Sequence, residues 1–164
     1  MQKFFKKPIQ LSEGSYKTFL NWVSVLTTII VFIVFVLTFR TGIVRSGSMY
    51  PLLDRGSLVL SFRTDDISYG DVVTFYHDNE VWVKRLIGDE GDLIAVHDGQ
   101  VYRNGEALEE PYINEAPMYE MDPVIVPKNC VFLMGDNRNN SKDSHIIGSV
   151  TKSSVIGPVI FYLK

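Results

Sequence analysis

Hydrophobic residues are distributed very unevenly along this chain. Residues 18–39 read TFLNWVSVLTTIIVFIVFVLTF and contain no ionisable side chain. As a helix, this stretch would span about 33 Å, enough to cross the roughly 30 Å hydrocarbon core of a bilayer. It is apolar on all sides, so a domain of this size could not cover it as a core helix. It is also longer than the apolar region of a cleavable signal peptide, roughly 7–15 residues. We therefore predict an uncleaved transmembrane anchor at 18–39.

The chain after Arg40 has a different pattern, in which short apolar runs alternate with turn sequences. The runs are rich in β-branched and aromatic residues, as strands are, and Asp98-Gly99 is a two-residue hairpin signature. From 106 to 127 the chain is acidic and contains four prolines, so we expect a long irregular connection there. The predicted fold class is mostly β, with one N-terminal helix followed by a β-rich domain at 40–164. The predicted strands are 57–62, 71–76, 81–87, 92–97, 100–102, 130–134 and 155–163.

Charge excludes one class of partner and indicates an orientation. After Lys17 the chain carries 12 basic and 18 acidic residues, and such an acidic body is a poor match for nucleic acid. Four lysines precede the apolar stretch, whereas three arginines follow it closely. This small excess predicts residues 1–17 as a short cytoplasmic N-terminus and 40–164 as an extracytoplasmic domain of a single-pass cell-membrane protein. The single cysteine, Cys130, allows no internal disulfide bond.

Two segments carry candidate residues for nucleophilic catalysis. In RSGSMYP (45–51), a serine between glycine and methionine could expose its hydroxyl beside free backbone amides; an ordinary linker is the alternative. In VWVKRLI (81–87), strand alternation places Lys84 on the same face as Trp82. Burial there would lower the pKa of Lys84 so that it could accept a proton near neutral pH. A surface lysine whose aliphatic stem covers apolar neighbours is the other interpretation.

A third segment, GDNRNNSKDS (135–144), is almost entirely polar and predicts a loop dense in hydrogen bonds. A calcium loop is excluded because Arg138 would stand at a ligand position and no glutamate follows at the required offset. A purely structural loop held by Asx turns remains open. We expect neither a metal nor a cofactor.

Taken together, RSGSMYP, VKRLIGDEGD and GDNRNNSKDS, with YGDVVTFY between the first two, resemble the type I signal peptidases of bacteria, in their small Gram-positive-like form. The resemblance implies Ser48 as nucleophile and Lys84 as general base of a Ser/Lys dyad. It also implies that Ser46 helps the Ser48 amide to form an oxyanion hole, and that Ser141 and Asp143 orient the lysine. The chain departs from the family pattern twice, with leucine at 52 instead of threonine and histidine at 145 instead of arginine.

The resemblance predicts a β-rich, membrane-anchored serine endopeptidase that cleaves signal peptides from exported preproteins. An extended substrate would add as a strand beside the active site. The expected partners are signal peptides, membrane lipid and, indirectly, the protein export machinery, and an apolar rim near Ile43 and Met49 is expected at the bilayer. A self-cleaving repressor-type Ser/Lys protease would need a DNA-binding domain for which this chain has no room. A catalytically inactive, membrane-tethered interaction domain of the same fold is the other alternative.

Overall fold

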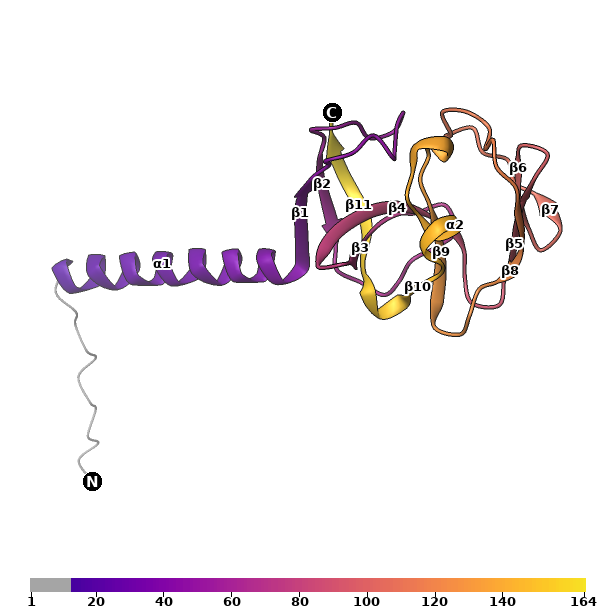
Figure 1. Cartoon of the computed structure of the whole chain (residues 1–164). Helices are drawn as coiled ribbons and strands as arrows, with labels where there is room; N and C mark the ends of the chain where they lie inside the picture. The colour runs from indigo at the N-terminus through magenta and orange to yellow at the C-terminus, as the bar shows by residue number, and fades with distance from the viewer. Residues whose placement is uncertain (1–12) are drawn as a thin grey trace, which may run out of the picture. The chain divides into compact units, whose positions relative to one another are not determined.

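The computed structural model describes residues 13–164, which divide into two compact units at Leu37 (Figure 1). The first unit contains helix α1 (Glu13–Thr38) except for its last residue. Its apolar window, Gly14–Thr38, is long and apolar enough to cross a membrane, with a mean hydropathy of 2.5. The helix begins before the predicted anchor and ends at Thr38, because Phe39 belongs to a strand. Of the predicted N-terminal segment 1–17, residues 1–12 lie outside the described residues.

Hydroxyl side chains within α1 are compatible with an apolar environment. Thr18, Thr27 and Thr28 each donate a hydrogen bond to the backbone carbonyl four residues earlier, at 2.8–3.0 Å. A hydroxyl that bonds the helix backbone in this way does not need water as a partner. The threonines that dilute the apolar stretch therefore do not prevent the helix from entering a bilayer.

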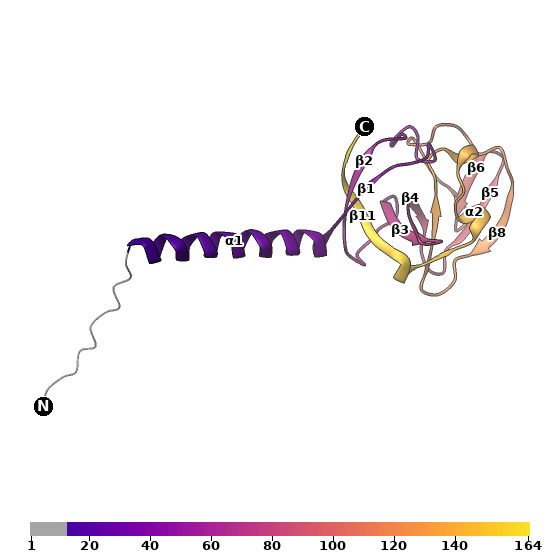
Figure 2. The ribbon, with the colours of Figure 1, turned by 60° about the vertical axis from the view of Figure 1, so that its left-hand side comes forward.

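The second unit, Thr38–Lys164, contains two antiparallel sheets. In both views, β1, β2 and β11 lie at the opposite end of this unit from β5, β6 and β8 (Figures 1 and 2). The seven-stranded sheet has the order β1 (Phe39–Ile43), β2 (Leu58–Phe62), β11 (Val155–Leu163), β3 (Val72–His77), β4 (Glu80–Gly88), β9 (Cys130–Met134) and β10 (Val150–Thr151). The four-stranded sheet has the order β7 (Glu106–Ala107), β6 (Gln100–Arg103), β5 (Leu93–His97) and β8 (Met121–Ile125). Short helical turns occur at η1 (Arg138–Asn140), α2 (Ser144–Ile147) and η2 (Lys152–Ser154).

The mostly β fold is confirmed, and the seven predicted strands are present with their ends shifted by at most one residue. The expectation of an irregular connection at 106–127 is wrong at β7 and β8. These two strands lie at the edges of the smaller sheet and have exposed side chains, so no apolar alternation marks them. Among residues 13–164, β8 pairs with β5 alone, and a strand at the edge of a sheet tolerates a proline such as Pro123.

The core of the second unit consists of three clusters, and β4 connects two of them. Leu86 packs in a cluster with Val73 and Phe75, whereas its neighbour Ile87 packs in another with Phe132. Strand β4 is therefore buried on both faces from Lys84 to Gly88. A lysine at the first position of such a stretch has little access to water.

Candidate active site

The serine loop, residues 44–53, follows β1 and is fixed to the core by its apolar residues. Met49 and Leu53 are fully buried in the third core cluster, and Leu52 packs against it. The Leu53 amide donates to the Met49 carbonyl at 2.9 Å. Ser48 is held between these anchors and Gly47, with only 6% of its surface exposed. The expectation that Met49 forms an apolar surface rim is therefore wrong, although Ile43 is exposed.

Lys84 on β4 lies directly against Ser48. Its Nζ is 2.7 Å from Ser48 Oγ and donates to the Val83 carbonyl at 3.0 Å, and the residue is 4% exposed. Burial lowers the pKa of Lys84 from 10.5 to about 8, an effect that the charges of Asp143 and Asp136 partly offset. A useful fraction of this amine is therefore neutral near physiological pH. The neutral form can accept the proton of the Ser48 hydroxyl.

Hydrogen-bond donors for a developing oxyanion lie beside the same hydroxyl. Ser46 Oγ donates to Ser48 Oγ at 3.2 Å. Within residues 13–164, the Ser48 amide donates to no other residue. An exposed hydroxyl and an unengaged amide next to a nucleophile can stabilise negative charge on a substrate carbonyl oxygen.

The polar loop, residues 135–145, holds the serine loop by backbone contacts that sequence reasoning missed. The Asn137 amide donates to the Ser48 carbonyl at 3.0 Å, and Asn137 Nδ2 donates to the Gly47 carbonyl at 3.1 Å. A Cβ at Gly135 would meet the Ser48 carbonyl oxygen at 2.5 Å and the Ser141 hydroxyl closer still. Only glycine fits there, and no local sequence signal reveals this because the close approach comes from residues far away in the chain.

Asp143 organises the end of the polar loop and lies near Lys84. Its carboxylate accepts hydrogen bonds from the Gly135 amide at 2.8 Å and from the His145 ring at 2.6 Å. Although burial raises the pKa of Asp143, the His145 ring, the nearby Ser141 hydroxyl and the Gly135 amide together bring it below its usual value. The Ser141 hydroxyl is close enough to contribute to this effect, yet within the described residues it lacks a well-oriented hydrogen bond. The structure thus brings Ser141 and Asp143 into the same site as the predicted dyad.

Two buried ion pairs connect the polar loop to other segments of the second unit. Arg85 Nε and Nη2 bind both carboxylate oxygens of Asp136, at 2.8 and 2.6 Å, so β4 and the polar loop are joined directly beside Lys84. Arg138 pairs with Glu110 through both of its terminal nitrogens, Nη1 and Nη2. In the sequence, Arg85 stands out only as the residue after Lys84. No local pattern connects Glu110 with the site.

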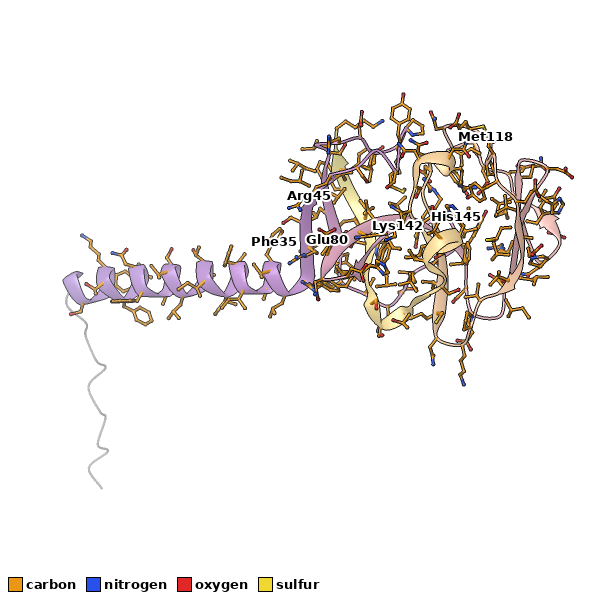
Figure 3. The ribbon with its side chains drawn as sticks, viewed as in Figure 1. Phe35, Arg45, Glu80, Met118, Lys142 and His145 are labelled. Atoms are coloured by element: carbon orange, nitrogen blue, oxygen red, sulfur yellow. The ribbon has the colours of Figure 1, made fainter. Side chains whose placement is uncertain are left out.

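A groove of about 960 Å³ in the second unit makes the side chains around Ser48 and Lys84 accessible from outside. On its two sides, within the part of the chain that the structure describes, residues 40–43 of β1 pair only with β2, and residues 80–84 of β4 pair only with β3. Unpaired strand edges of this kind can hydrogen-bond an added extended chain. Its lining includes Ser46, Ser48, Lys84 and Ser141, together with the charged residues Arg45, Glu80 and Lys142 that are labelled in Figure 3.

Comparisons with known proteins agree on one family. The model of the family described as signal peptidase, peptidase S26, matches residues 18–163. Thylakoidal processing peptidase 1 of Arabidopsis thaliana is 37% identical over 137 residues, which cover 72% of this chain and 40% of that protein. Signal peptidase I S of Bacillus subtilis is 32% identical over 166 residues, which cover 89% of this chain and 90% of that protein. A crystal structure of a signal peptidase I from Enterococcus faecalis superimposes with a TM-score of 0.53 at 28% identity, over 57% of this chain and 97% of that one.

Proposed function

This chain belongs to the signal peptidase S26 family, as its three motifs predict, and we propose that it removes signal peptides from exported preproteins with Ser48 and Lys84 as its dyad. The chain spans about two fifths of the plant relative but nine tenths of the Bacillus one. The observation that carries the proposal is the buried contact of 2.7 Å between Lys84 Nζ and Ser48 Oγ. A lysine placed in this way has no evident structural purpose, because it occupies a core position at the cost of desolvation.

In the proposed reaction, Ser48 Oγ attacks the scissile carbonyl while the neutral amine of Lys84 takes its proton. The oxyanion accepts hydrogen bonds from the Ser48 amide and the Ser46 hydroxyl. Collapse of the tetrahedral intermediate breaks the peptide bond, and the Lys84 ammonium protonates the leaving amine. Lys84, neutral again, then activates a water that hydrolyses the Ser48 ester.

The substrate would bind as an extended chain in the groove, between the unpaired edges of β1 and β4. Strand addition supplies backbone hydrogen bonds whatever the side chains are, which suits an enzyme that acts on many preproteins. The family resemblance further implies small residues at substrate positions −1 and −3. No metal or cofactor takes part in this scheme.

The proposed topology places residues 1–17 in the cytoplasm, the anchor at 18–39 in the cell membrane and 40–164 outside it. The four lysines that precede the apolar stretch 18–39, against the three arginines that follow it closely, support this orientation. Contact of the second unit with membrane lipid is supported by Ile43, Leu58 and Leu163, which are exposed and adjacent across β1, β2 and β11. Any contact with the export machinery would be indirect, through the shared preprotein.

The experiment that tests this function is cleavage of a purified preprotein by the full chain in detergent, followed by N-terminal sequencing of the product. Ser48→Ala and Lys84→Arg should each abolish cleavage, the second because a guanidinium stays protonated at working pH. Lys152→Arg is the matched control, since Lys152 pairs with Asp89 on the surface, and it should cleave normally. Absence of cleavage by the wild type would favour the inactive interaction domain, and cleavage by Lys84→Arg would contradict the lysine base.

A further inference from the structure

The segment between β7 and β8 is attached to the polar loop by a buried ion pair. We name residues 108–120 the clamp segment. Within it, Glu110 accepts hydrogen bonds at 2.6 Å from both terminal nitrogens of Arg138. The Arg138 side chain is fully buried, and that of Glu110 is 5% exposed. A bidentate pair that excludes water fixes both the position and the orientation of the arginine.

Other contacts follow the clamp segment along its length. The Asn114 amide donates to the Asp136 carbonyl at 3.1 Å, so the segment also bonds the loop backbone. Asn139 reaches back with both ends of its side chain, accepting from the Met118 amide at 2.7 Å and donating to the Ala116 carbonyl at 2.9 Å. Aromatic rings complete the attachment, with Tyr112 against the Arg85 guanidinium and Tyr119 stacked on His145.

Arg138 transmits this attachment to the reacting groups. Its Nε donates to the Gly135 carbonyl at 3.0 Å. Gly135 in turn lies against the Ser48 carbonyl and the Ser141 hydroxyl, and its amide donates to Asp143. A rotation of Arg138 would therefore displace the residue that holds the serine loop and the carboxylate near Lys84.

We infer that Glu110 is a positioning residue of this enzyme, which acts through Arg138 to hold the polar loop, and with it Ser48 and Lys84, in reactive geometry. The expected loss of kcat rests on the proposed peptidase function. The attachment of the polar loop by Glu110 and Arg138 does not depend on that function. Without the carboxylate, Arg138 would be a buried cation with no counter-ion, and it would turn toward water. Gly135 would then lose its hydrogen bond from Arg138 Nε.

The test compares Glu110→Gln with Glu109→Gln in the full chain in detergent. Glu109 is the exposed neighbour in the clamp segment, so its variant is matched in chemistry and position. Glu110→Gln should lower kcat at least about tenfold and change KM less than about threefold, because it disturbs reacting groups rather than the groove. Glu109→Gln should behave as the wild type. Glu110→Asp, which keeps a carboxylate, should retain more activity than Glu110→Gln.

Hydrogen exchange supplies a readout that needs no substrate. Amides in 135–145 should exchange faster in Glu110→Gln, while those of the β5–β6 hairpin should not change. Normal kcat in a folded Glu110→Gln protein, or unchanged exchange in the loop, would overturn the inference. An inactive wild type would contradict the proposed function. The exchange rates would then still test whether Glu110 holds the polar loop in place.

A double variant separates positioning from stability. Glu110→Leu with Arg138→Met removes both buried charges, and such replacements often preserve stability. We expect this protein to unfold at a temperature close to the wild type and still to turn over slowly, because nothing fixes Gly135. Wild-type kcat in the double variant would overturn the positioning role.

Discussion

Replacement of Lys84 by methionine should stabilise the folded protein while it abolishes catalysis. Lowering the pKa of Lys84 from 10.5 to about 8 means that the fold disfavours the charged amine by about 3 kcal/mol. Methionine fills a similar volume without a charge. It also loses the hydrogen bond from Lys84 Nζ to the Val83 carbonyl, which offsets about 1 kcal/mol of this gain. We therefore expect a net gain of about 1–3 kcal/mol in the free energy of unfolding at pH 7.

The sign of the pH dependence makes this prediction specific. A lysine whose pKa is lower in the folded than in the unfolded protein makes the fold less stable as pH falls from about 10.5 to about 8. Below the lower value, both states are protonated and the penalty is fully present. The gain from Lys84→Met should thus be largest at pH 7 and fall by about 2 kcal/mol or more at pH 10.

The measurement is urea unfolding of the full chain in detergent micelles. The chain has two tryptophans, Trp22 and Trp82, so a Trp22→Phe background leaves Trp82 as the fluorescent reporter of the second unit. Lys152→Met is the control, because a hydrogen bond from Lys152 to Asp89 raises the pKa of that exposed lysine and no buried charge is relieved. A Lys84→Met protein that is less stable than the wild type at pH 7, or equally stabilised at both pH values, would refute the reasoning.

Three further predictions concern activity and membrane contact. With chemistry rate-limiting, kcat/KM should fall about tenfold per pH unit below the Lys84 pKa of about 8; a flat profile from pH 6 to 9 would contradict this. The fragment 38–164 should cleave peptides but aggregate without detergent, and Ile43→Ser with Leu163→Ser should reduce that aggregation, as light scattering can show. His145→Ala should lower activity at most about tenfold, because the His145 ring binds Asp143; a thousandfold loss in a folded protein would indicate that His145 is the base.

The parts of the fold that the sequence predicts are those in which burial leaves a pattern. The apolar stretch and the strands β2, β3, β4, β5, β6, β9 and β11 were predictable because their side chains are buried or uniformly apolar. Strand β8 could not be predicted, because its last four residues are exposed and its pairing with β5 is set by the partner. The strand β1 was missed for a similar reason, since Arg40 and Thr41 face solvent.

The candidate site divides in the same way. Strand alternation alone indicates that Lys84 shares a face with Trp82, and the Nζ lies 5.7 Å from the centre of that ring. Its contact with Ser48 joins residues 36 positions apart, which periodicity cannot reveal and only the resemblance suggested. The requirement for glycine at 135 depends on the approach of the Ser48 carbonyl, and the role of Glu110 depends on a pairing across 28 positions. Such features follow from tertiary packing and have no local signal.

The same packing explains why the ionic groups are arranged as they are. In the proposed mechanism Lys84 needs desolvation to act as a base, but a buried amine beside apolar residues alone would have too low a pKa to protonate the leaving amine readily. Asp143 and Asp136 partly offset the effect of burial. A buried carboxylate without a partner would destabilise the fold. Arg85 binds Asp136, and His145 binds Asp143. Arg138 braces the same loop, and its charge needs Glu110. The Arg85–Asp136 and His145–Asp143 pairs therefore hold two carboxylates whose charges partly offset the lowering of the Lys84 pKa by burial.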